Sequence, residues 1–369
     1  MKVLHINSYY NGCPFYRNLY DAQVKLGMDI QVFVPMPKGD KGARADYGPY
    51  TDVSEDHLKY DRAIFQIKHA KILKDAMQRY GDRQFDMIHA HSLFSNGYIA
   101  MKLSERTGAP YMVAVRDTDV NVFFAKMPHL RALGRRILSG AAKVIFLSKS
   151  YRDQALQRYL TPEQFMNMLD KCAIIPNGID PFWHKNQAQA HPLQPGKIRL
   201  ISVGRASKRK NIRSAVNAAK LLIERGIDVQ FDIVIGVIED EGILSQLQAP
   251  PFVTLHQQLT RDRLLPLYRT ADIFILPSLT ETFGIVYPEA MSQGLPVIYT
   301  KDQGFDGQFA QGEIGYAVDP MDADAMADAI QRIIANYGEI SARCPEASAV
   351  YNWDDFAAQY LSIYREAGR

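Results

Sequence analysis

The chain has 369 residues, of which 47% are hydrophobic and 22% are charged, and its formal net charge at pH 7 is +3. This composition is that of a globular protein, and it excludes a disordered or fibrous chain. The length exceeds what one hydrophobic core usually supports, so we expect two α/β domains.

The composition indicates neither a metal framework nor a membrane span. Cys13, Cys172 and Cys344 are odd in number and lack metal-ligand spacing, so we predict no disulfide and no zinc site. Residues 1–7 have the pattern of a strand rather than a secretory signal, and no apolar run reaches the roughly 18 to 20 residues of a spanning helix. We therefore expect a cytoplasmic protein.

The charge is unevenly distributed along the chain. Residues 1–180 hold 25 Lys and Arg against 18 Asp and Glu, whereas residues 181–369 hold 18 against 22. A positive first half would be drawn toward anionic surfaces or acidic substrates. An uneven solvated surface is the more ordinary explanation, and we expect no nucleic-acid partner.

Strand and helix patterns alternate through the first half, which implies a parallel sheet with helices on both faces. In chain order we predict a strand at 2–6, a helix at 15–26, a strand at 29–34, a loop at 37–57, a helix at 59–80, a strand at 85–90, a helix at 97–105, a strand at 111–115, a helix at 128–139, a strand at 143–147, a helix at 151–159 and a strand at 172–175.

A polar segment at 186–195 contains proline and shows no periodicity, so it is the predicted linker, and the alternation restarts after it. In chain order we predict a strand at 198–203, a helix at 211–224, strands at 230–235 and 252–256, a helix at 261–269, a strand at 273–276, a helix at 290–293, strands at 296–299 and 315–317, and helices at 322–337 and 353–365. The predicted domains are 1–185 and 196–350, followed by a terminal helical segment at 351–369.

The segment 281–289, Glu-Thr-Phe-Gly-Ile-Val-Tyr-Pro-Glu, places two carboxylates eight positions apart around a glycine. It lies between a strand pattern and a helix-forming run, where open α/β sheets bind ligands. Free N–H groups at a helix start would suit an anion there. The plain structural alternative makes Glu281 a helix-capping acid and Glu289 a surface helix charge.

A second polar segment follows the strand predicted at 198–203. Gly204 would let the backbone approach a ligand closely. Arg205 and Lys210 stand beside a helix pattern that opens at Asn211, an arrangement that favours a diphosphate. A solvated basic turn over 208–210 is the alternative.

Taken together, these segments resemble the motifs of family-4 glycosyltransferases, which are retaining enzymes of the GT-B type. The resemblance is carried by Val-Gly-Arg at 203–205 with its trailing Lys210, Pro-Asn-Gly-Ile-Asp at 176–180, Leu-Pro-Ser at 276–278, the two glutamates of 281–289, and Ala-Met-x-x-Gly-x-Pro-Val at 290–297. It covers essentially the whole chain and is strongest from 172 to 320. It implies an α/β GT-B fold, in which two Rossmann-like parallel-sheet domains face each other across a cleft and the C-terminal helix crosses back to the first domain.

The resemblance also implies roles for individual residues. Glu289 would accept hydrogen bonds from the ribose hydroxyls of a nucleotide, and Glu281 would lie by the donor sugar. Arg205 and Lys210 would neutralise the leaving diphosphate in place of a metal, so we expect no metal and no cofactor. The other donor-side residues implied are Thr282, Phe283, Gly284, Ile285, Gly12, Gln257 and Leu259. The donor domain would be the second and the acceptor domain the first.

The first half departs from the family's pattern at the strand end after residue 115. Arg116 and Asp117 stand where the family has His-Gly, and a permanently charged Arg116 cannot relay a proton. It would instead bind an anionic sugar or acceptor group. Asp117-Thr-Asp119 has the form of the Asp-x-Asp of metal-dependent transferases, which belongs to a different fold, so metal binding is the less favoured alternative.

Two other positions leave alternatives open. His89 and His91 share one face of a strand, but a metal pair has no evident third ligand. We favour His91 as a hydrogen-bonded histidine near the acceptor. Gln257 stands where the family often has glycine, which would alter the base pocket.

The segment 121–143 combines apolar side chains with Lys126, Arg131, Arg135 and Arg136. Such a segment suits an anionic membrane surface, with weak peripheral attachment at its inner face. Core packing of the apolar side chains is the more common explanation.

We therefore predict a retaining, metal-independent glycosyltransferase that moves a sugar from a nucleotide-diphosphate sugar to a carbohydrate or lipid-linked acceptor, in surface polysaccharide or glycolipid biosynthesis. Two rivals stay open. A nucleotide-sugar epimerase of related fold would act on the donor alone, and a non-catalytic carbohydrate-binding protein would not react at all.

Overall fold

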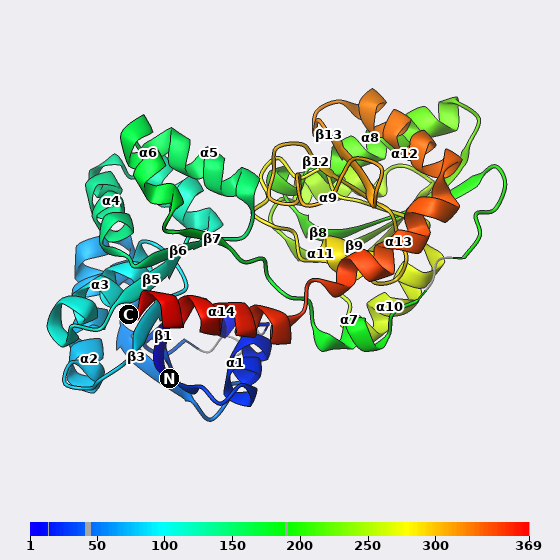
Figure 1. Ribbon diagram of the computed structural model, residues 1–369. Coiled ribbons are helices and arrows are strands. Elements are labelled where there is room, and N and C mark those ends of the chain that lie inside the picture. Colours follow the sequence, from blue (N-terminus) through cyan, green and yellow to red (C-terminus); the bar gives the residue numbers. More distant parts are fainter. Residues whose placement is uncertain (14, 41–45, 189–190, 369) are drawn as a thin grey trace. The chain divides into compact units, whose positions relative to one another are not determined.

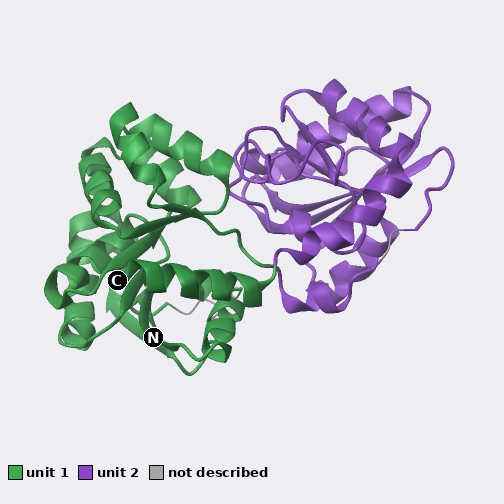
Figure 2. Cartoon of the chain, viewed as in Figure 1, with its two compact units in different colours: residues 1–178, 352–369 green, residues 179–351 purple. Residues whose placement is uncertain are grey.

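The computed structural model of the protein describes residues 1–13, 15–40, 46–188 and 191–368. The chain divides into two compact units, residues 1–178 with 352–369 and residues 179–351 (Figure 2). The predicted boundary after residue 185 falls inside the second unit, because the helix α7 (Pro181–Lys185) already belongs to it. Residues 189 and 190 of the predicted linker lie outside the described residues.

The first unit is built on a seven-stranded parallel sheet with the order β3-β2-β1-β4-β5-β6-β7. Its strands are β1 (Lys2–Ile6), β2 (Asp29–Pro37), β3 (Thr51–His57), β4 (Met87–Ala90), β5 (Tyr111–Ala114), β6 (Lys143–Phe146) and β7 (Cys172–Ile174). Its helices are η1 (Tyr10–Gly12), α1 (Tyr16–Lys25), η2 (Lys59–Ala63), α2 (Phe65–Tyr80), α3 (Ser95–Thr107), η3 (Asp119–Phe124), η4 (Pro128–Leu130), α4 (Arg131–Gly140), α5 (Lys149–Tyr159), α6 (Pro162–Leu169) and α14 (Trp353–Ala367).

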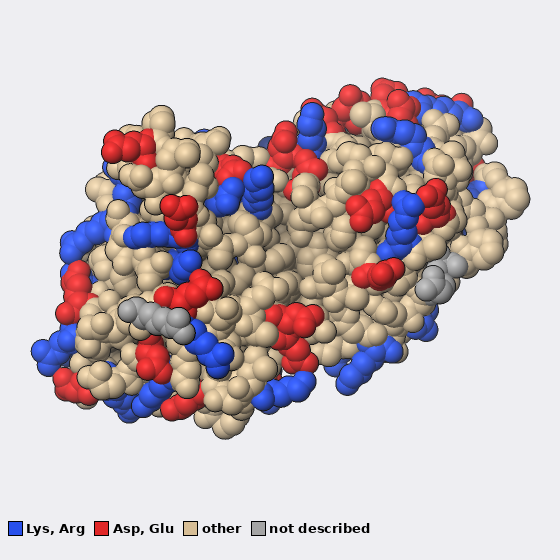
Figure 3. Space-filling model, in the orientation of Figure 1, with Lys and Arg blue, Asp and Glu red and all other residues tan. Residues whose placement is uncertain are grey.

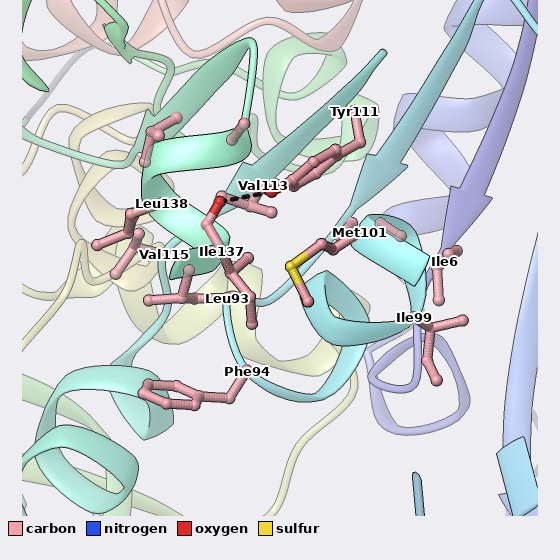
Figure 4. Packing of buried hydrophobic residues seen from close by; sticks show 14 of the residues in the cluster. Ile6, Leu93, Phe94, Ile99, Met101, Tyr111, Val113, Val115, Ile137 and Leu138 are labelled. Carbon is pink, nitrogen blue, oxygen red and sulfur yellow. Dashed lines mark hydrogen bonds between the residues drawn. The ribbon is translucent and has the colours of Figure 1, made fainter. Parts of the chain in front are cut away.

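The core of this unit lies between the central strands and the helices that cover them (Figures 1 and 4). Strands β4 and β5 are buried at every position, as expected for central strands covered on both faces. In Figure 4 the phenol of Tyr111 reaches across to α4, where its O–H donates a hydrogen bond of 2.8 Å to the carbonyl oxygen of Ile137. The central strand β5 and the helix α4 are thereby held together.

The C-terminal helix α14 packs within the first unit, against α1. The ammonium of Lys25 lies 2.7 Å from a carboxylate oxygen of Asp354, and the Gln23 side chain donates to the Tyr364 hydroxyl at 3.3 Å. Tyr364 also lies 2.7 Å from His89 Nδ1 of β4. The last helix therefore contributes Tyr364 to the interior of the first unit, where it contacts α1 and β4.

The second unit is built on a six-stranded parallel sheet with the order β10-β9-β8-β11-β12-β13. Its strands are β8 (Lys197–Ala206), β9 (Asp228–Ile238), β10 (Val253–Gln257), β11 (Ile273–Ile275), β12 (Val297–Thr300) and β13 (Gly315–Val318). Besides α7, its helices are η5 (Lys208–Lys210), α8 (Ile212–Glu224), α9 (Glu241–Gln248), α10 (Arg261–Thr270), α11 (Val286–Met291), α12 (Ala323–Ala335) and α13 (Tyr337–Ala349).

Both sheets reverse their strand order once, between the first strand and a later neighbour. In the second unit the reversal lies between β8 and β11, and in the first unit it lies between β1 and β4. Open α/β sheets bind ligands at the carboxyl ends of the strands flanking such a reversal. We therefore expect ligand-binding residues in the loops that follow these four strands.

The structure corrects the predicted elements in several places. The strand β3 lies in the segment predicted as a loop at 37–57, of which residues 41–45 are outside the described residues. The helices α6, α7, α9 and α13 and the short helices η1, η3 and η5 were not predicted. Most of the remaining strands and helices begin and end within a few residues of the prediction.

The basic segment 121–143 uses its apolar side chains in the core. Phe124, Leu130 and Ile137 are buried, and Phe123 and Leu133 pack against the same cluster. The core-packing explanation is therefore the one that the structure supports for these side chains. Within the described part of the chain, no helix is both long and apolar enough to cross a bilayer. On the face drawn in Figure 3, acidic and basic side chains are interspersed.

Candidate functional site

The loops after β8 and β11 meet at the reversal of the second sheet. The backbone N–H of Leu279 donates to the carbonyl of Arg209 at 2.8 Å, and the Arg209 guanidinium donates to the carbonyl of Thr280 at 3.0 Å. The side-chain amide of Asn211, at the start of α8, donates to the carbonyl of Pro277 at 3.1 Å. These bonds hold two segments some 70 residues apart in one fixed arrangement.

The same two loops bring Lys210 and Glu281 together. Lys210 Nζ lies 2.5 Å from Glu281 Oε2, and the two side chains are only 12% and 10% exposed. The hydroxyl of Ser278 lies 3.4 Å from the same carboxylate oxygen. A nearly buried ion pair loses much of its hydration, so it persists only where the geometry is good. The pair thus places an ammonium and a carboxylate, both oriented, at the ligand-binding end of the sheet.

The conformation of the loop that follows Glu281 depends on two glycines, one within the loop and one in the loop after β12. Gly284 has φ of +81°, a left-handed conformation that side chains rarely adopt, and a Cβ there would collide with the ring of Tyr287. A Cβ on Gly304 would collide with the backbone of Thr282 and Phe283. Because Gly304 can approach so closely, its N–H donates to the Glu281 carbonyl at 2.8 Å.

The loop after β12 thus supports the candidate site, a role that sequence reasoning missed. Besides Gly304, it supplies Gln303, whose side-chain oxygen accepts from the Glu281 N–H at 2.9 Å. The signal in the sequence was a Gln-Gly step just after a predicted strand, which is common in turns and carries little specificity.

Arg205 does not join the Lys210–Glu281 pair in the structure. Its guanidinium lies 2.8 Å from a carboxylate oxygen of Glu239, just beyond β9, and the two side chains are 55% and 43% exposed. Exposed pairs of this kind are worth about 1 kcal/mol or less, so Arg205 is free to change partner when an anion binds.

Glu289 lies within α11, eight positions from Glu281, and is partly buried. The pKa of its carboxyl is raised from 4.5 to about 8, because burial raises it most, a hydrogen bond with Trp183 lowers it, and the charge of Asp180 raises it. A carboxyl held so far from its ordinary pKa is typical of a functional position. Of the four side chains expected to gather around one ligand, two are in contact and two have other neighbours.

The remaining predicted donor-side residues range from buried to exposed. Gln257 ends the edge strand β10 with an exposed side chain, and Leu259, just beyond it, is partly buried. Thr282 and Ile285 flank the buried Phe283 in the loop described above. Gly12 is exposed at the end of η1, and nothing lies within 4 Å of where its Cβ would be. Gly12 is therefore not required by local packing.

In the first unit, His91 belongs to a buried cluster of three histidines. His5 of β1 pairs in register with His89 of β4, and the ligand atoms that the three rings offer lie within 4.8 Å of one another. His5 Nδ1 lies 3.0 Å from His91 Nε2, and the rings of His89 and His91 stack with centroids 4.2 Å apart. All three are fully buried, and burial lowers the pKa of each, that of His5 to about 3.

His5 is the third imidazole of this cluster, and the sequence analysis did not identify it. The stacked rings and their mutual hydrogen bonds suit neutral histidines that hold β1 and β4 together. The side chain of His91 has no exposed surface, so it reaches a ligand only through its neighbours.

The carboxylate of Asp119 fixes the backbone around the ends of β4 and β5. It accepts backbone N–H bonds from Leu93, Phe94 and Arg116 at 2.9, 3.0 and 2.9 Å, and it is fully buried. Burial raises the pKa of Asp119 to about 6, while these bonds lower it. Asp117, in contrast, accepts from the Asn121 side chain at 2.8 Å.

Arg116 lies at the carboxyl end of β5, partly buried. Its Nε donates to the His91 carbonyl at 3.3 Å. Burial lowers the pKa of its guanidinium, whereas the nearby phenols of Tyr16, Tyr360 and Tyr9 and the carboxylate of Asp119 raise it. The structure thus holds a guanidinium at the strand end where the family has histidine.

Two parallel-sheet units of this topology define the class of GT-B glycosyltransferases, and the comparisons with known proteins agree. The family profile described as Glycosyltransferase Family 4 matches residues 15–182, and the one described as Glycosyl transferases group 1 matches residues 184–349. The chain belongs to the family-4 glycosyltransferases.

Individual relatives are distant. A D-inositol 3-phosphate glycosyltransferase of Paenarthrobacter aurescens is 25% identical, over 96% of this chain and 92% of the relative. The solved sucrose-phosphate synthase of Thermosynechococcus elongatus has a TM-score of 0.78 at 20% identity, covering 99% and 98% of the two chains. HepE of Anabaena, solved with UDP and glucose, has a TM-score of 0.68 at 15% identity, covering 98% of each. At these identities the two solved structures are similar to this chain in fold.

Proposed function

We propose that this glycosyltransferase moves a sugar, with retention of configuration, from a nucleotide-diphosphate sugar to a carbohydrate or lipid-linked acceptor. The donor would bind to the second unit, at the carboxyl ends of β8 and β11. The observation that carries the proposal is the Lys210–Glu281 pair, because it sets a cation and an acid at the ligand-binding reversal of the sheet.

The proposed roles follow from charge and position. Lys210, joined by Arg205 when it leaves Glu239, would neutralise the diphosphate as negative charge develops on it. Glu281 would orient Lys210 and accept a hydrogen bond from the donor sugar. The backbone N–H groups of the loop 282–285 would approach the sugar and distal phosphate where Gly284 bends the chain. Glu289 would accept hydrogen bonds from the ribose.

The proposed reaction needs no dedicated protein base. The bond between the sugar's anomeric carbon and the phosphate oxygen breaks, and its electrons leave with the nucleoside diphosphate. The acceptor hydroxyl attacks the same face of the sugar and gives its proton to the departing phosphate oxygen. The products are the glycosylated acceptor and a nucleoside diphosphate.

The donor is tested by ligand-induced stabilisation. Uridine-diphosphate sugars come first, because the solved HepE complexes contain UDP and UDP-glucose. A ligand that binds only the folded state raises the melting temperature, so we expect one nucleotide sugar to raise it and sugar-free nucleotide to raise it less. Donor with a panel of acceptors should then yield nucleoside diphosphate and a new glycoside of retained configuration by NMR. An epimerised sugar formed without acceptor would identify an epimerase, and binding without turnover would identify a carbohydrate-binding protein.

We also propose a setting in surface polysaccharide or glycolipid biosynthesis, since one solved structure of this fold, WaaB, is a lipopolysaccharide outer core galactosyltransferase. Attachment at an anionic membrane would rest on the basic side chains of the segment 121–143 alone, because its apolar side chains pack in the core. Flotation with anionic liposomes should then show binding at low salt that is lost at high salt. Absence of flotation at low salt would rule out attachment.

A further inference from the structure

The first unit contains a hollow of about 670 Å³ that the proposed donor site does not use. It opens where several strands of the sheet end: Ser8 follows β1, Pro37 ends β2, His57 ends β3, and Thr118 follows β5. Its volume lies within the range of about 300–1,000 Å³ that small-molecule sites occupy. The carboxyl ends of these strands are also the side on which this class of sheet binds ligands.

Positive charge dominates the wall of the hollow. It is lined by Lys38, Lys59, Arg62 and Lys68, and among its described lining residues Asp40 is the one carboxylate. Within the described residues, none of the four cations has an ion-pair partner.

The acidic groups nearby have other partners. Asp61 pairs with Lys71 at 2.7 Å, Asp56 pairs with His57 at 2.5 Å, and a Glu55 oxygen accepts the N–H of Gly39 at 3.1 Å. The four cations therefore outnumber the carboxylates near the hollow, which are Asp40 in its wall and Asp56 close to Lys68.

Lys68 is the most constrained of the four. Its side chain is partly buried on α2. Burial lowers the pKa of its ammonium, the charge of Asp56 raises it, and the charge of Arg62 lowers it. Keeping an ammonium away from water without a partner is costly, so this position favours a ligand that brings negative charge.

The rest of the wall suits a sugar. Pro35, Pro37 and Phe123 present apolar surface on which the C–H face of a sugar ring packs. Ser8 and Thr118 contribute hydroxyl groups that both donate and accept hydrogen bonds. A sugar or polyol that carries an anionic group matches both the cationic side chains and the apolar and hydroxyl-bearing side chains of the wall.

We propose that this hollow binds the acceptor substrate through a phosphate group that Lys59, Arg62 and Lys68 hold, with the acceptor's sugar or polyol against Phe123. The proposal rests on the proposed function and specifies its acceptor. A phosphate monoester fits better than a carboxylate, because it brings up to two charges and three oxygens to several separate donors. Its source is either a soluble sugar phosphate or a lipid-linked phosphate.

Calorimetric titration at low salt tests the site directly, with inorganic phosphate, a hexose 6-phosphate and the unphosphorylated hexose as probes. We expect the hexose phosphate to bind more tightly than phosphate, and the neutral hexose not to bind. The double variant Lys59→Ala/Arg62→Ala should weaken phosphate-probe affinity by at least about tenfold, as should Lys68→Met. Both exposed residues of the double variant can be removed without opening the core.

The matched control is Lys74→Ala/Arg106→Ala, which removes two exposed cations of the same unit that do not line the hollow. It changes net charge equally and should leave affinity within about twofold, a change of about 0.4 kcal/mol. If soluble probes fail but a polyprenyl phosphate in neutral vesicles binds and depends on Lys59 and Arg62, the acceptor is lipid-linked.

The proposal is overturned if no phosphate-bearing probe binds, or if the double variant and the control lose affinity equally. Stabilisation by nucleotide sugars is measured in parallel and should be the same in every variant. If nucleotide sugars do not stabilise the wild type although phosphate probes bind, the proposed transferase function is wrong and the hollow is an anion-binding site only.

Discussion

The ammonium of Lys210 and the carboxylate of Glu281 are nearly buried and 2.5 Å apart, so neither is easily replaced. Glu281→Gln keeps the size of the side chain but removes its charge, leaving Lys210 without its partner. We expect transfer to fall by about 10²–10³-fold, the effect of removing one oriented polar group from a reacting centre. The free energy of unfolding should fall by less than about 3 kcal/mol, because each side chain keeps some contact with water.

Glu241→Gln is the matched control, since Glu241 is exposed at the start of α9 in the same unit. It should change neither turnover nor stability. Initial rates with saturating donor separate the two variants, and urea unfolding measures both stabilities. If Glu281→Gln transfers sugar at a rate near that of wild type, the role proposed for Glu281 is wrong.

The raised pKa of Glu289 predicts a pH dependence of donor affinity. Its carboxyl has a pKa of about 8 in the free protein, and we propose that its ionised form accepts the ribose hydroxyls. Binding then favours deprotonation, so affinity should rise by up to about tenfold per pH unit toward pH 8 and level off above it. The diphosphate diester of a nucleotide sugar does not titrate in this range.

Titration calorimetry from pH 6.5 to 9 measures this profile. Glu289→Gln should bind more weakly and with a flat profile, which separates the carboxyl from other titrating groups. An affinity that falls with rising pH, or a slope that survives in Glu289→Gln, would contradict the assigned role.

For single residues, the sequence predicted where the site residues lie better than which side chains they pair with. Lys210 and Glu281 each follow a strand, and parallel strands end at one edge, so their approach follows from topology. The pairing of Arg205 with Glu239 could not be predicted, because exposed side chains choose partners by local geometry. His5 was missed because a histidine inside a strand looks ordinary until the register sets it beside His89.

Among the elements, the loop between β11 and α11 depends most on its backbone. Gly284→Ala would force an L side chain into the left-handed region and against the Tyr287 ring. We expect a loss of about 1–3 kcal/mol in unfolding free energy and weaker donor binding. Gly338→Ala in α13 is the control, since nothing lies within 4 Å of its Cβ position, and it should be neutral or stabilise by about 0.5–1 kcal/mol.

Thermal unfolding and nucleotide-sugar titration of both glycine variants check this prediction. Equal behaviour of the two variants would mean that the loop 281–285 relaxes freely, and the backbone N–H groups of 282–285 would then not be the donor's fixed partners.

The missed elements share a physical cause. The strand β3 is polar, with the sequence Thr-Asp-Val-Ser-Glu-Asp-His, because it is an edge strand that pairs only with β2. Without an apolar face, period-two patterning disappears. The helix α13 contains Gly338 and Pro345, both of which weaken helix patterns, yet it buries Cys344 and Ile340 against the second unit's core. Tertiary packing overrides local preference there.

The stability of the protein as a whole should fall in acid through its buried histidines. Burial lowers the pKa of His5 to about 3, and it also lowers the pKa of His89 and His91, whereas an unfolded histidine has a pKa near 6.5. Below pH 6.5 the unfolded chain takes up protons that the folded chain refuses, so folded stability is complete above this pH and is lost as pH falls toward 3. Each such group contributes up to about 1.4 kcal/mol per pH unit.

The two tryptophans allow the first unit to be followed alone, since Trp353 lies in it and Trp183 lies in the second. In a Trp183→Phe background, urea unfolding between pH 7 and 5 should show that the unfolding free energy depends on pH with a slope that His5→Gln reduces by about 1 kcal/mol per pH unit on average. Asp119, with its pKa raised to about 6, binds protons in the folded state and opposes the trend, which is why the difference between variants is compared. An unchanged slope in His5→Gln would mean that His5 is already protonated in the folded protein, and the neutral histidine cluster would be wrong.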